Sequence, residues 1–327
     1  MSRIISRRRI LKSATNLLAG VAGITGCEQI VATRNQVQSQ AQTKTRNTNV
    51  KAYGVVLTNA YLSELRDCIS RGNYNTIKVV TAWGLKEGWN EDTRRQVCEM
   101  TPNTIVLTAV GNGVEKDAFP YTNIVLEQIK PWYEVNPEIF IEIGNEPNGN
   151  VWGRNRRSSE FVKEWRSYFQ QAVKACRQEF PKAKLISSGL ASLGIHKPDL
   201  YRWCDIAGDV MSECDYIGFH FYVKNDWYDQ DTGFPDIIST MKKYFSHKAW
   251  MLTEFGIENR KVIPYVKGIR YADLINFGKS NPVLPKNVWG ATYFHLDMNR
   301  TSDLHHNFNI YPSGDDAYRR RTSSDYF

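Results

Sequence analysis

The sequence predicts an α/β fold, a single (β/α)₈ barrel over residues 51–327. Two observations lead to this prediction. Eight short runs rich in Val, Ile, Thr and aromatic residues alternate with amphipathic segments along this part of the chain, which is typical of parallel strands joined by crossover helices. The runs are also too apolar to leave one face in water, as expected for strands that are covered on both sides.

The expected strands are short and evenly spread along the chain. Each run is bounded by polar or turn-forming residues. The eight expected strands are 53–58, 76–82, 104–110, 138–145, 184–189, 215–221, 249–254 and 287–295.

The expected helices show apolar residues that return every three or four positions. In 159–179, apolar side chains occur at i, i+4, i+8, i+11, i+12 and i+15 counted from Phe161, which forms one stripe on a helix. Ser158 precedes this segment as a candidate N-cap. Shorter patterns of the same kind occupy 62–69 and 234–245.

A doubly wound open sheet is the alternative fold. Such a sheet normally carries a glycine-rich phosphate loop after its first strand. Here that place reads Thr58-Asn59-Ala60-Tyr61, and the Gly-Asn-Gly at 111–113 lacks the remaining spacing. The barrel is therefore favoured.

Residues 1–27 have the features of an export signal. Ser6-Arg7-Arg8-Arg9-Ile10-Leu11-Lys12 is typical of a twin-arginine signal, and the apolar stretch after it is too short to span a bilayer. This stretch ends in Ile24-Thr25-Gly26-Cys27, which resembles a bacterial lipobox, so we expect lipidation of Cys27. The alternative is an ordinary basic N-terminus with an incidental cysteine.

Residues 28–50 are polar and carry few large apolar side chains, so we expect a flexible tether. The expected protein is a lipoprotein anchored to a bacterial membrane outside the cytoplasm, in the periplasm or at the cell surface.

The formal charge of +8 comes largely from the expected signal. Residues 1–26 contain five basic residues and no acidic one, which leaves 37 basic against 34 acidic residues, or +3. No basic stripe interleaved with aromatic residues is present, so we expect no nucleic-acid partner.

Five cysteines follow Cys27, and this odd number leaves at least one unpaired. Cys68 and Cys98 fall on successive expected helices, and the sequence leaves their pairing open. No cysteine or histidine group has the spacing of metal ligands, so we expect neither a metal nor a cofactor.

Two of the expected strands end on a glutamate, in Ile141-Glu142-Ile143-Gly144-Asn145-Glu146-Pro147-Asn148 and Trp250-Met251-Leu252-Thr253-Glu254-Phe255-Gly256. The C-terminal ends of barrel strands meet at one mouth, where barrel enzymes hold their chemistry. Side chains alternate along a strand, so Glu142 and Glu146 should share the interior face, and Leu252 and Glu254 should share one face as well. Two carboxylates at one cleft are the minimal apparatus for cleaving a glycosidic bond.

The chain resembles the clan A retaining glycoside hydrolases, a cellulase- and mannanase-like (β/α)₈ superfamily. Asn145-Glu146-Pro147 matches the clan's motif at the end of strand four, and Thr253-Glu254-Phe255-Gly256 matches the one at strand seven. Gly218-Phe219-His220-Phe221-Tyr222 matches the His and Tyr, two residues apart, at strand six. The three motifs in this order cover the whole expected barrel.

The resemblance implies a role for each matched residue. Glu146 is the expected acid/base and Glu254 the expected nucleophile. Asn145 would bind the sugar 2-hydroxyl, Tyr222 would donate to Glu254, and His220 would orient the site or contact the sugar. Trp83, Trp152 and Trp227 are candidate platforms for sugar rings.

Without catalysis, the Asn-Glu-Pro would be a simple turn, Glu254 would pair with a barrel arginine, and His220 would be a satisfied interior residue. The pattern also departs from the clan in places. Strand two carries Lys78 where many members have arginine, and an ammonium does not reproduce a bidentate guanidinium. The His of many members after strand three is missing here, and strand eight ends in Tyr293-Phe294-His295-Leu296-Asp297 without a Trp.

The expected protein is a monomeric retaining glycosidase that hydrolyses a β-linked glycan (glucan, mannan or xylan) by double displacement, and its short loops favour endo-action. Its expected partners are this oligo- or polysaccharide and, through the lipid anchor, a membrane. One alternative is a transglycosylase that acts on envelope glycan with the same two glutamates. Another is a glycan-binding lipoprotein without catalysis.

Overall fold

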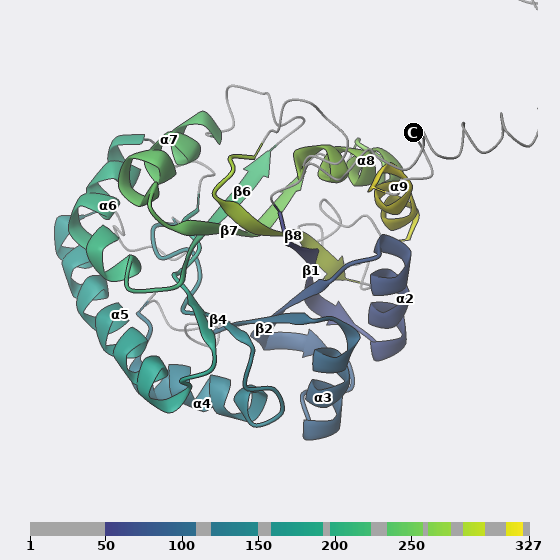
Figure 1. Ribbon diagram of the computed structural model, residues 1–327, viewed down its shortest axis with the longest axis horizontal. Coiled ribbons are helices and arrows are strands. Elements are labelled where there is room, and N and C mark those ends of the chain that lie inside the picture. Colours follow the sequence, from purple (N-terminus) through teal and green to yellow (C-terminus); the bar gives the residue numbers. More distant parts are fainter. Residues whose placement is uncertain are drawn as a thin grey trace, which may run out of the picture. The chain divides into compact units, whose positions relative to one another are not determined.

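The computed structural model describes residues 50–108, 119–149, 158–191, 197–223, 234–257, 261–275, 284–297 and 312–322. All of them belong to one compact unit, Arg46–Tyr326. They form a closed ring of parallel strands with helices outside it (Figure 1). Because β1 pairs with β8, the sheet is a barrel and not an open doubly wound sheet. The predicted (β/α)₈ fold is confirmed.

The strands follow one another around the barrel in chain order. They are β1 (Ala52–Ala60), β2 (Thr76–Leu85), β3 (Asn103–Leu107), β4 (Phe140–Glu142), β5 (Lys184–Ile186), β6 (Tyr216–Val223), β7 (Ala249–Ile257) and β8 (Val288–Asp297). Among the described residues, the helices are α2 (Leu62–Gly72), α3 (Glu91–Met100), α4 (Thr122–Tyr133), α5 (Ser159–Glu179), α6 (Lys197–Met211), α7 (Phe234–Phe245), α8 (Pro264–Leu274) and α9 (Ser313–Thr322).

Helix α5 shows how the apolar stripe determines packing. It covers the predicted residues 159–179, and the side chain of Ser158 accepts a hydrogen bond from the backbone N–H of Phe161 at 3.2 Å. The whole predicted stripe, from Phe161 to Cys176, is buried against the barrel. The helix is therefore held by this one face.

Strands β4 and β5 are shorter than the sequence predicts. After β4 the backbone leaves the sheet, with positive φ angles of 78° at Gly144 and 41° at Glu146. Beyond this point the ladder between the two segments is reduced to an isolated bridge between Asn145 and Gly189. The early end of these strands turns the Asn-Glu pair toward the mouth of the barrel.

An apolar layer fills the barrel interior near the starts of several strands. Ile105, Phe140, Ile186 and Met251 pack together there, and Trp289 packs against them. The Trp289 ring centroid lies 5.4 Å from that of Phe140. Trp289 is thus part of the interior core, and this layer closes the barrel beneath the polar site.

The side chains of β7 do not alternate as predicted. Phe219 pairs with Leu252, but the next residue of β6, His220, pairs with Glu254, so that Thr253 is an extra residue in β7. Such a β-bulge turns two successive side chains to the same side. Leu252 packs in the outer core with the helices, whereas Thr253 and Glu254 both contact interior groups. The prediction that Leu252 and Glu254 share a face is wrong for this reason.

Cys68 and Cys98 do not form a disulfide, and Cys176, Cys204 and Cys214 are free thiols as well. In the portion of the chain that the structure describes, no helix has both the length and the apolar character needed to cross a bilayer.

Candidate active site

A compact set of polar and charged side chains lies inside the barrel. Lys78 comes from near the start of its strand, and the other members come from the C-terminal halves of their strands or from just beyond them. Its members come from four strands spread around the barrel, of which only β6 and β7 are neighbours, so that only closure of the barrel brings them together. They are Lys78 on β2, Glu142 on β4, Glu146 just after β4, His220 and Tyr222 on β6, and Thr253 and Glu254 on β7. These seven residues are called the charged cluster below.

Glu146 is held by the turn that follows β4. Its backbone N–H donates to the carbonyl of Gly189 at 3.2 Å, and its own carbonyl accepts from Gly149 at 2.9 Å. Asn148 fastens the same turn, because its amide exchanges hydrogen bonds of 3.0 and 2.9 Å with the backbone of Ala191. These contacts hold Glu146 at its positive φ, a conformation that a non-glycine residue adopts only when its surroundings impose it.

The two predicted catalytic carboxylates lie close together. One oxygen of Glu146, one of Glu254 and one nitrogen of His220 are all within 4.8 Å of one another. His220 Nδ1 is 2.8 Å from Oε1 of Glu146 and 3.5 Å from Oε2 of Glu254. The side chain of Glu146 is 23% exposed and that of Glu254 only 6%. Glu146 therefore faces the open mouth, and Glu254 lies deeper.

Glu254 is stabilised as a carboxylate. Burial alone would raise its pKa, but the positive charges of His220 and Lys78 outweigh burial and lower the pKa, and the Tyr222 hydroxyl contributes in the same direction. Lys78 Nζ lies 2.9 Å from Oε1, and the Tyr222 hydroxyl donates to Oε2 at 2.5 Å. The sequence predicted the Tyr222 contact from the resemblance.

Lys78 and Glu142 were not among the predicted site residues. Both side chains are fully buried, and Lys78 Nζ lies 2.7 Å from Oε2 of Glu142 while it also contacts Glu254. One compact ammonium thus pairs with two carboxylates, and no bidentate arginine fork is needed here. The signal in the sequence was a lysine between Ile77 and Val79, whose outward-facing side chains leave Lys78 inside the barrel.

His220 is packed tightly among the carboxylates. Burial alone would lower its pKa, but the charge of Glu254 and hydrogen bonds to Glu142 and Glu146 outweigh burial and the opposing charge of Lys78, and raise the pKa to about 9. Gly189 gives the ring its space, since a Cβ there would stand 2.2 Å from His220 Nε2. A pKa raised in this way favours the imidazolium form of His220 at neutral pH.

Asn145 lies beside this cluster and has an unused acceptor. Its Oδ1 is buried, and among the described residues it has no hydrogen-bond partner. A buried polar atom without a partner is costly unless a ligand or water satisfies it. The atom is therefore available to a ligand that enters the mouth.

The spacing of Glu146, His220 and Glu254 would also suit a cation. The protein itself already supplies positive charge, since Lys78 Nζ lies 2.9 Å from Oε1 of Glu254 and the raised pKa of His220 favours its charged form. An imidazolium has no free nitrogen lone pair with which to bind a metal. The cluster therefore fits proton transfer and covalent chemistry better than metal binding.

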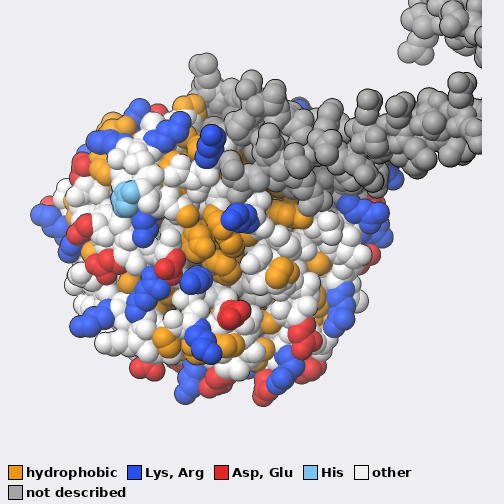
Figure 2. All heavy atoms as spheres, viewed as in Figure 1, with side chains coloured by type: hydrophobic (Ala, Val, Ile, Leu, Met, Phe, Trp, Pro, Cys, Tyr) orange, Lys and Arg blue, Asp and Glu red, His pale blue; other side chains and the backbone are white. Residues whose placement is uncertain are grey.

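The three predicted aromatic platforms are not placed by the structure. Trp83 belongs to β2, but its side chain is outside the described residues, as are Trp152, Trp227 and the expected lipidation site Cys27. The barrel face in Figure 2 carries basic and acidic side chains intermingled around its edge.

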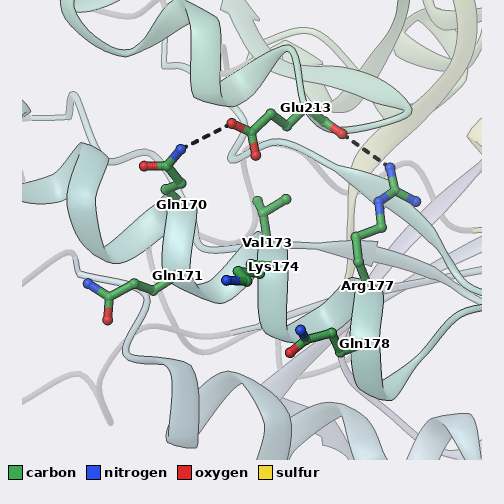
Figure 3. Close-up of a pocket in the computed structure, with 7 residues that line it drawn as sticks. All are labelled: Gln170, Gln171, Val173, Lys174, Arg177, Gln178 and Glu213. Atoms are coloured by element: carbon green, nitrogen blue, oxygen red, sulfur yellow. Dashed lines mark hydrogen bonds between the residues drawn. The ribbon is translucent and has the colours of Figure 1, made fainter.

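A pocket lies on the outer helix layer (Figure 3). Side chains of α5 line it together with Glu213, which accepts from the Gln170 amide at 3.3 Å and, through its carbonyl, from Arg177 at 3.2 Å. None of its lining residues belongs to the charged cluster.

Comparison with known proteins supports the fold. No protein-family model matches the sequence, and no curated protein matches it. A glycoside hydrolase family 5 enzyme from Prevotella bryantii B14 is similar in structure, with a TM-score of 0.53 and 16% identity over 86% of this chain and 100% of that one. The catalytic domain of a mannanase from Streptomyces sp. SirexAA-E has a TM-score of 0.50 and 13% identity, over 83% of this chain and 85% of that one.

A family 39 glycoside hydrolase from Bacteroides cellulosilyticus WH2 is also similar, with a TM-score of 0.52 and 12% identity, over 83% of this chain and 63% of that one. At these identities the likeness establishes the (β/α)₈ fold, and the chemistry has to be argued from the charged cluster.

Proposed function

We propose that the chain is a retaining glycoside hydrolase that cleaves a β-linked glycan. The observation that carries this proposal is the closeness of Glu146 and Glu254. One carboxylate oxygen of each lies within 4.8 Å of one of the other at the mouth of the barrel. Retaining enzymes hold their two carboxyl groups about 5–5.5 Å apart, whereas inverting enzymes leave about 6.5–9.5 Å for a water molecule. The spacing favours double displacement.

In the first step, one of the two carboxylate oxygens of Glu254 attacks the anomeric carbon. The bond from that carbon to the leaving oxygen breaks, and the leaving oxygen takes the proton of Glu146. The products are a glycosyl ester on Glu254, an ionised Glu146 and a released sugar hydroxyl.

In the second step, Glu146 accepts a proton from water while the water oxygen bonds to the anomeric carbon. The ester bond to Glu254 breaks and returns the carboxylate, so both glutamates regain their starting states. The environments of the two residues support this division of work. Lys78 and Tyr222 stabilise negative charge on Glu254, while the more exposed Glu146 can reach the leaving oxygen.

Asn145 supplies the contact to the substrate. Its buried Oδ1 lacks a partner among the described residues, so a sugar hydroxyl that donates to it removes the cost of an unsatisfied acceptor. We assign this contact to the 2-hydroxyl, next to the carbon under attack, where it strengthens in the transition state. Glucan, mannan and xylan are the candidate glycans, with endo-action on the chain.

The proposal places the enzyme on the outer side of a bacterial membrane, held by lipid on Cys27 and a tether over residues 28–50. The basis for this is the twin-arginine pattern and the lipobox-like Ile24-Thr25-Gly26-Cys27. Radiolabelled palmitate fed to cells that produce the full chain should label the wild type and leave Cys27→Ala unlabelled.

Trapping of the glycosyl ester tests the chemistry directly. The protein is incubated with aryl 2-deoxy-2-fluoro-β-glycosides of glucose, mannose and xylose and of their disaccharides, and adducts are located by peptide mass spectrometry. The expected result is one label on Glu254 from at least one probe, which also identifies the sugar. Glu254→Gln is the control that should take no label.

Other outcomes would change the assignment. A label on a different carboxylate would refute the role of Glu254. A folded protein that binds oligosaccharide and takes no label would favour a glycan-binding protein. If the label forms and an added acceptor sugar captures it faster than water does, the enzyme is a transglycosylase.

A further inference from the structure

A third carboxylate, Glu142, lies directly beneath the two predicted catalytic ones. Its side chain is fully buried, with Oε2 2.7 Å from Lys78 Nζ and Oε1 2.7 Å from the Thr253 hydroxyl. Oε1 is also 3.4 Å from His220 Nε2. Because Glu142 has no exposed surface, it acts on a substrate only through its neighbours.

The hydrogen bonds around His220 assign the proton on one ring nitrogen. The Thr253 hydroxyl donates its only proton to Glu142, so its oxygen can only accept from His220 Nε2, 3.1 Å away. Nε2 therefore carries a hydrogen. The other nitrogen, Nδ1, faces Oε1 of Glu146 at 2.8 Å. Its proton decides whether His220 donates to Glu146 or accepts from it.

We propose that Glu142 is a positioning residue that keeps His220 in its imidazolium form, so that Nδ1–H is donated to Oε1 of Glu146 and only Oε2 exchanges a proton with the substrate. The assignment of Glu146 as acid/base rests on the proposed function. The effect of Glu142 on His220 does not, because it is a property of the protein without substrate.

The charges of the cluster support this role. In the proposed reaction, two anions, Glu142 and Glu254, balance two cations, Lys78 and His220, at the start, and Glu146 supplies the proton that the leaving oxygen takes. In the glycosyl enzyme the negative charge has moved from Glu254 to Glu146, and the total is unchanged. Glu142 is the one carboxylate of the three whose charge stays constant, since Lys78 and His220 lower its pKa to about 2 despite burial.

His220 lies where this charge moves. Nδ1 is 2.8 Å from Glu146 and 3.5 Å from Glu254, so an imidazolium stabilises the anion in both half-reactions. The titratable groups that face His220 are Glu142, Glu146, Glu254, Lys78 and Tyr222.

The test is a pH titration by ¹⁵N NMR of the protein labelled at its six histidines, with the His220 signals assigned from a His220→Gln variant. In the wild type both nitrogens of His220 should be protonated at pH 7. In Glu142→Gln the midpoint of the His220 titration should fall by about 1 to 3 pH units, the size expected when one nearby opposite charge is removed. Asp315→Asn is the matched control, a buried carboxylate outside the cluster, and it should leave the midpoint unchanged.

Kinetics supply a second readout. In Glu142→Gln, kcat should fall as the pH rises through the lowered His220 midpoint, with KM unchanged, and it should recover at acidic pH. A neutral His220 at pH 7 in the wild type, which needs no variant to fold, would overturn the proposal, and so would an unchanged midpoint in Glu142→Gln. If the NMR results hold and no glycoside is turned over, the proposed function fails while the role of Glu142 on His220 stands.

Discussion

Replacement of Lys78 by Met is the sharpest test of the charged cluster, because one substitution removes the cation from two buried carboxylates. Lys78 Nζ lies 2.7 Å from Glu142 and 2.9 Å from Glu254, and its side chain is fully buried. Removal of one partner from a buried ion pair costs about 3–5 kcal/mol, because the other charge stays behind without compensation. We expect the free energy of unfolding to fall by this amount at pH 7.

The pH dependence of this loss follows from Glu142. Its pKa is about 2 in the folded wild type against an ordinary value of 4.5, a difference worth about 3 kcal/mol. Because the folded-state pKa is the lower one, this stabilisation is present above pH 4.5 and is lost as the pH falls toward 2. Without Lys78, burial raises the pKa of Glu142, so its carboxylate takes up a proton at higher pH. The deficit of Lys78→Met should therefore shrink as the pH is lowered from 7 to 4.

Urea unfolding at pH 7, 6, 5 and 4, followed by fluorescence of the nine tryptophans, measures both effects. Lys267→Met is the matched control. Lys267 is also buried, and burial alone lowers its pKa to about 8, so its removal should produce no deficit that varies between pH 4 and 7. A loss below about 1 kcal/mol for Lys78→Met, or one that is independent of pH, would refute the ion-pair reasoning.

Three further substitutions test other contacts. Tyr222→Phe removes the hydroxyl that donates to the predicted nucleophile. A hydrogen bond to a charged group is worth about 1.5–3 kcal/mol, so kcat on the aryl glycoside identified by trapping should fall about 10- to 150-fold. An unchanged kcat would contradict that role. Gly189→Ala places a Cβ 2.2 Å from His220 Nε2 and should lower the midpoint of urea unfolding by an amount equivalent to about 1–3 kcal/mol. In the control Gly208→Ala the new Cβ meets a ring carbon of Phe245 at 3.6 Å, and the midpoint should not fall. Asp315 is buried and accepts hydrogen bonds from two tyrosine hydroxyls, and burial raises its pKa to about 6 from 3.8. Its contribution to the free energy of unfolding, about 3 kcal/mol, is present below pH 3.8 and is lost as the pH rises through 6. Stability curves of the wild type should show this loss, and those of Asp315→Asn should not.

The strand and helix pattern could be predicted because it depends on local periodicity. The stripe of α5 and its Ser158 cap are properties of consecutive residues, and the structure contains both. The end of β4 was less predictable. The departure from the sheet at Gly144 and Glu146 depends on hydrogen bonds to Gly189 and Ala191, which are more than 40 residues further along the chain.

Which residues gather at the mouth of the barrel could be predicted in part. Motifs at strand ends named Glu146, His220, Tyr222 and Glu254, because residues at the ends of barrel strands must meet at the mouth. Which oxygen or nitrogen meets which could not be predicted. The bulge at Thr253 is an exception to the alternation of side chains along a strand, and it depends on the pairing of β7 with β6.

The sequence alone determined the barrel, the order of its strands and the presence of two glutamates at strand ends, because each of these follows from local patterns repeated along the chain. Only the tertiary structure decided that Lys78 and Glu142 belong to the same cluster as those glutamates. Lys78 and Glu254 are 176 residues apart, and their attraction depends on distances of a few ångströms and on exclusion of water. Closure of the barrel creates both conditions.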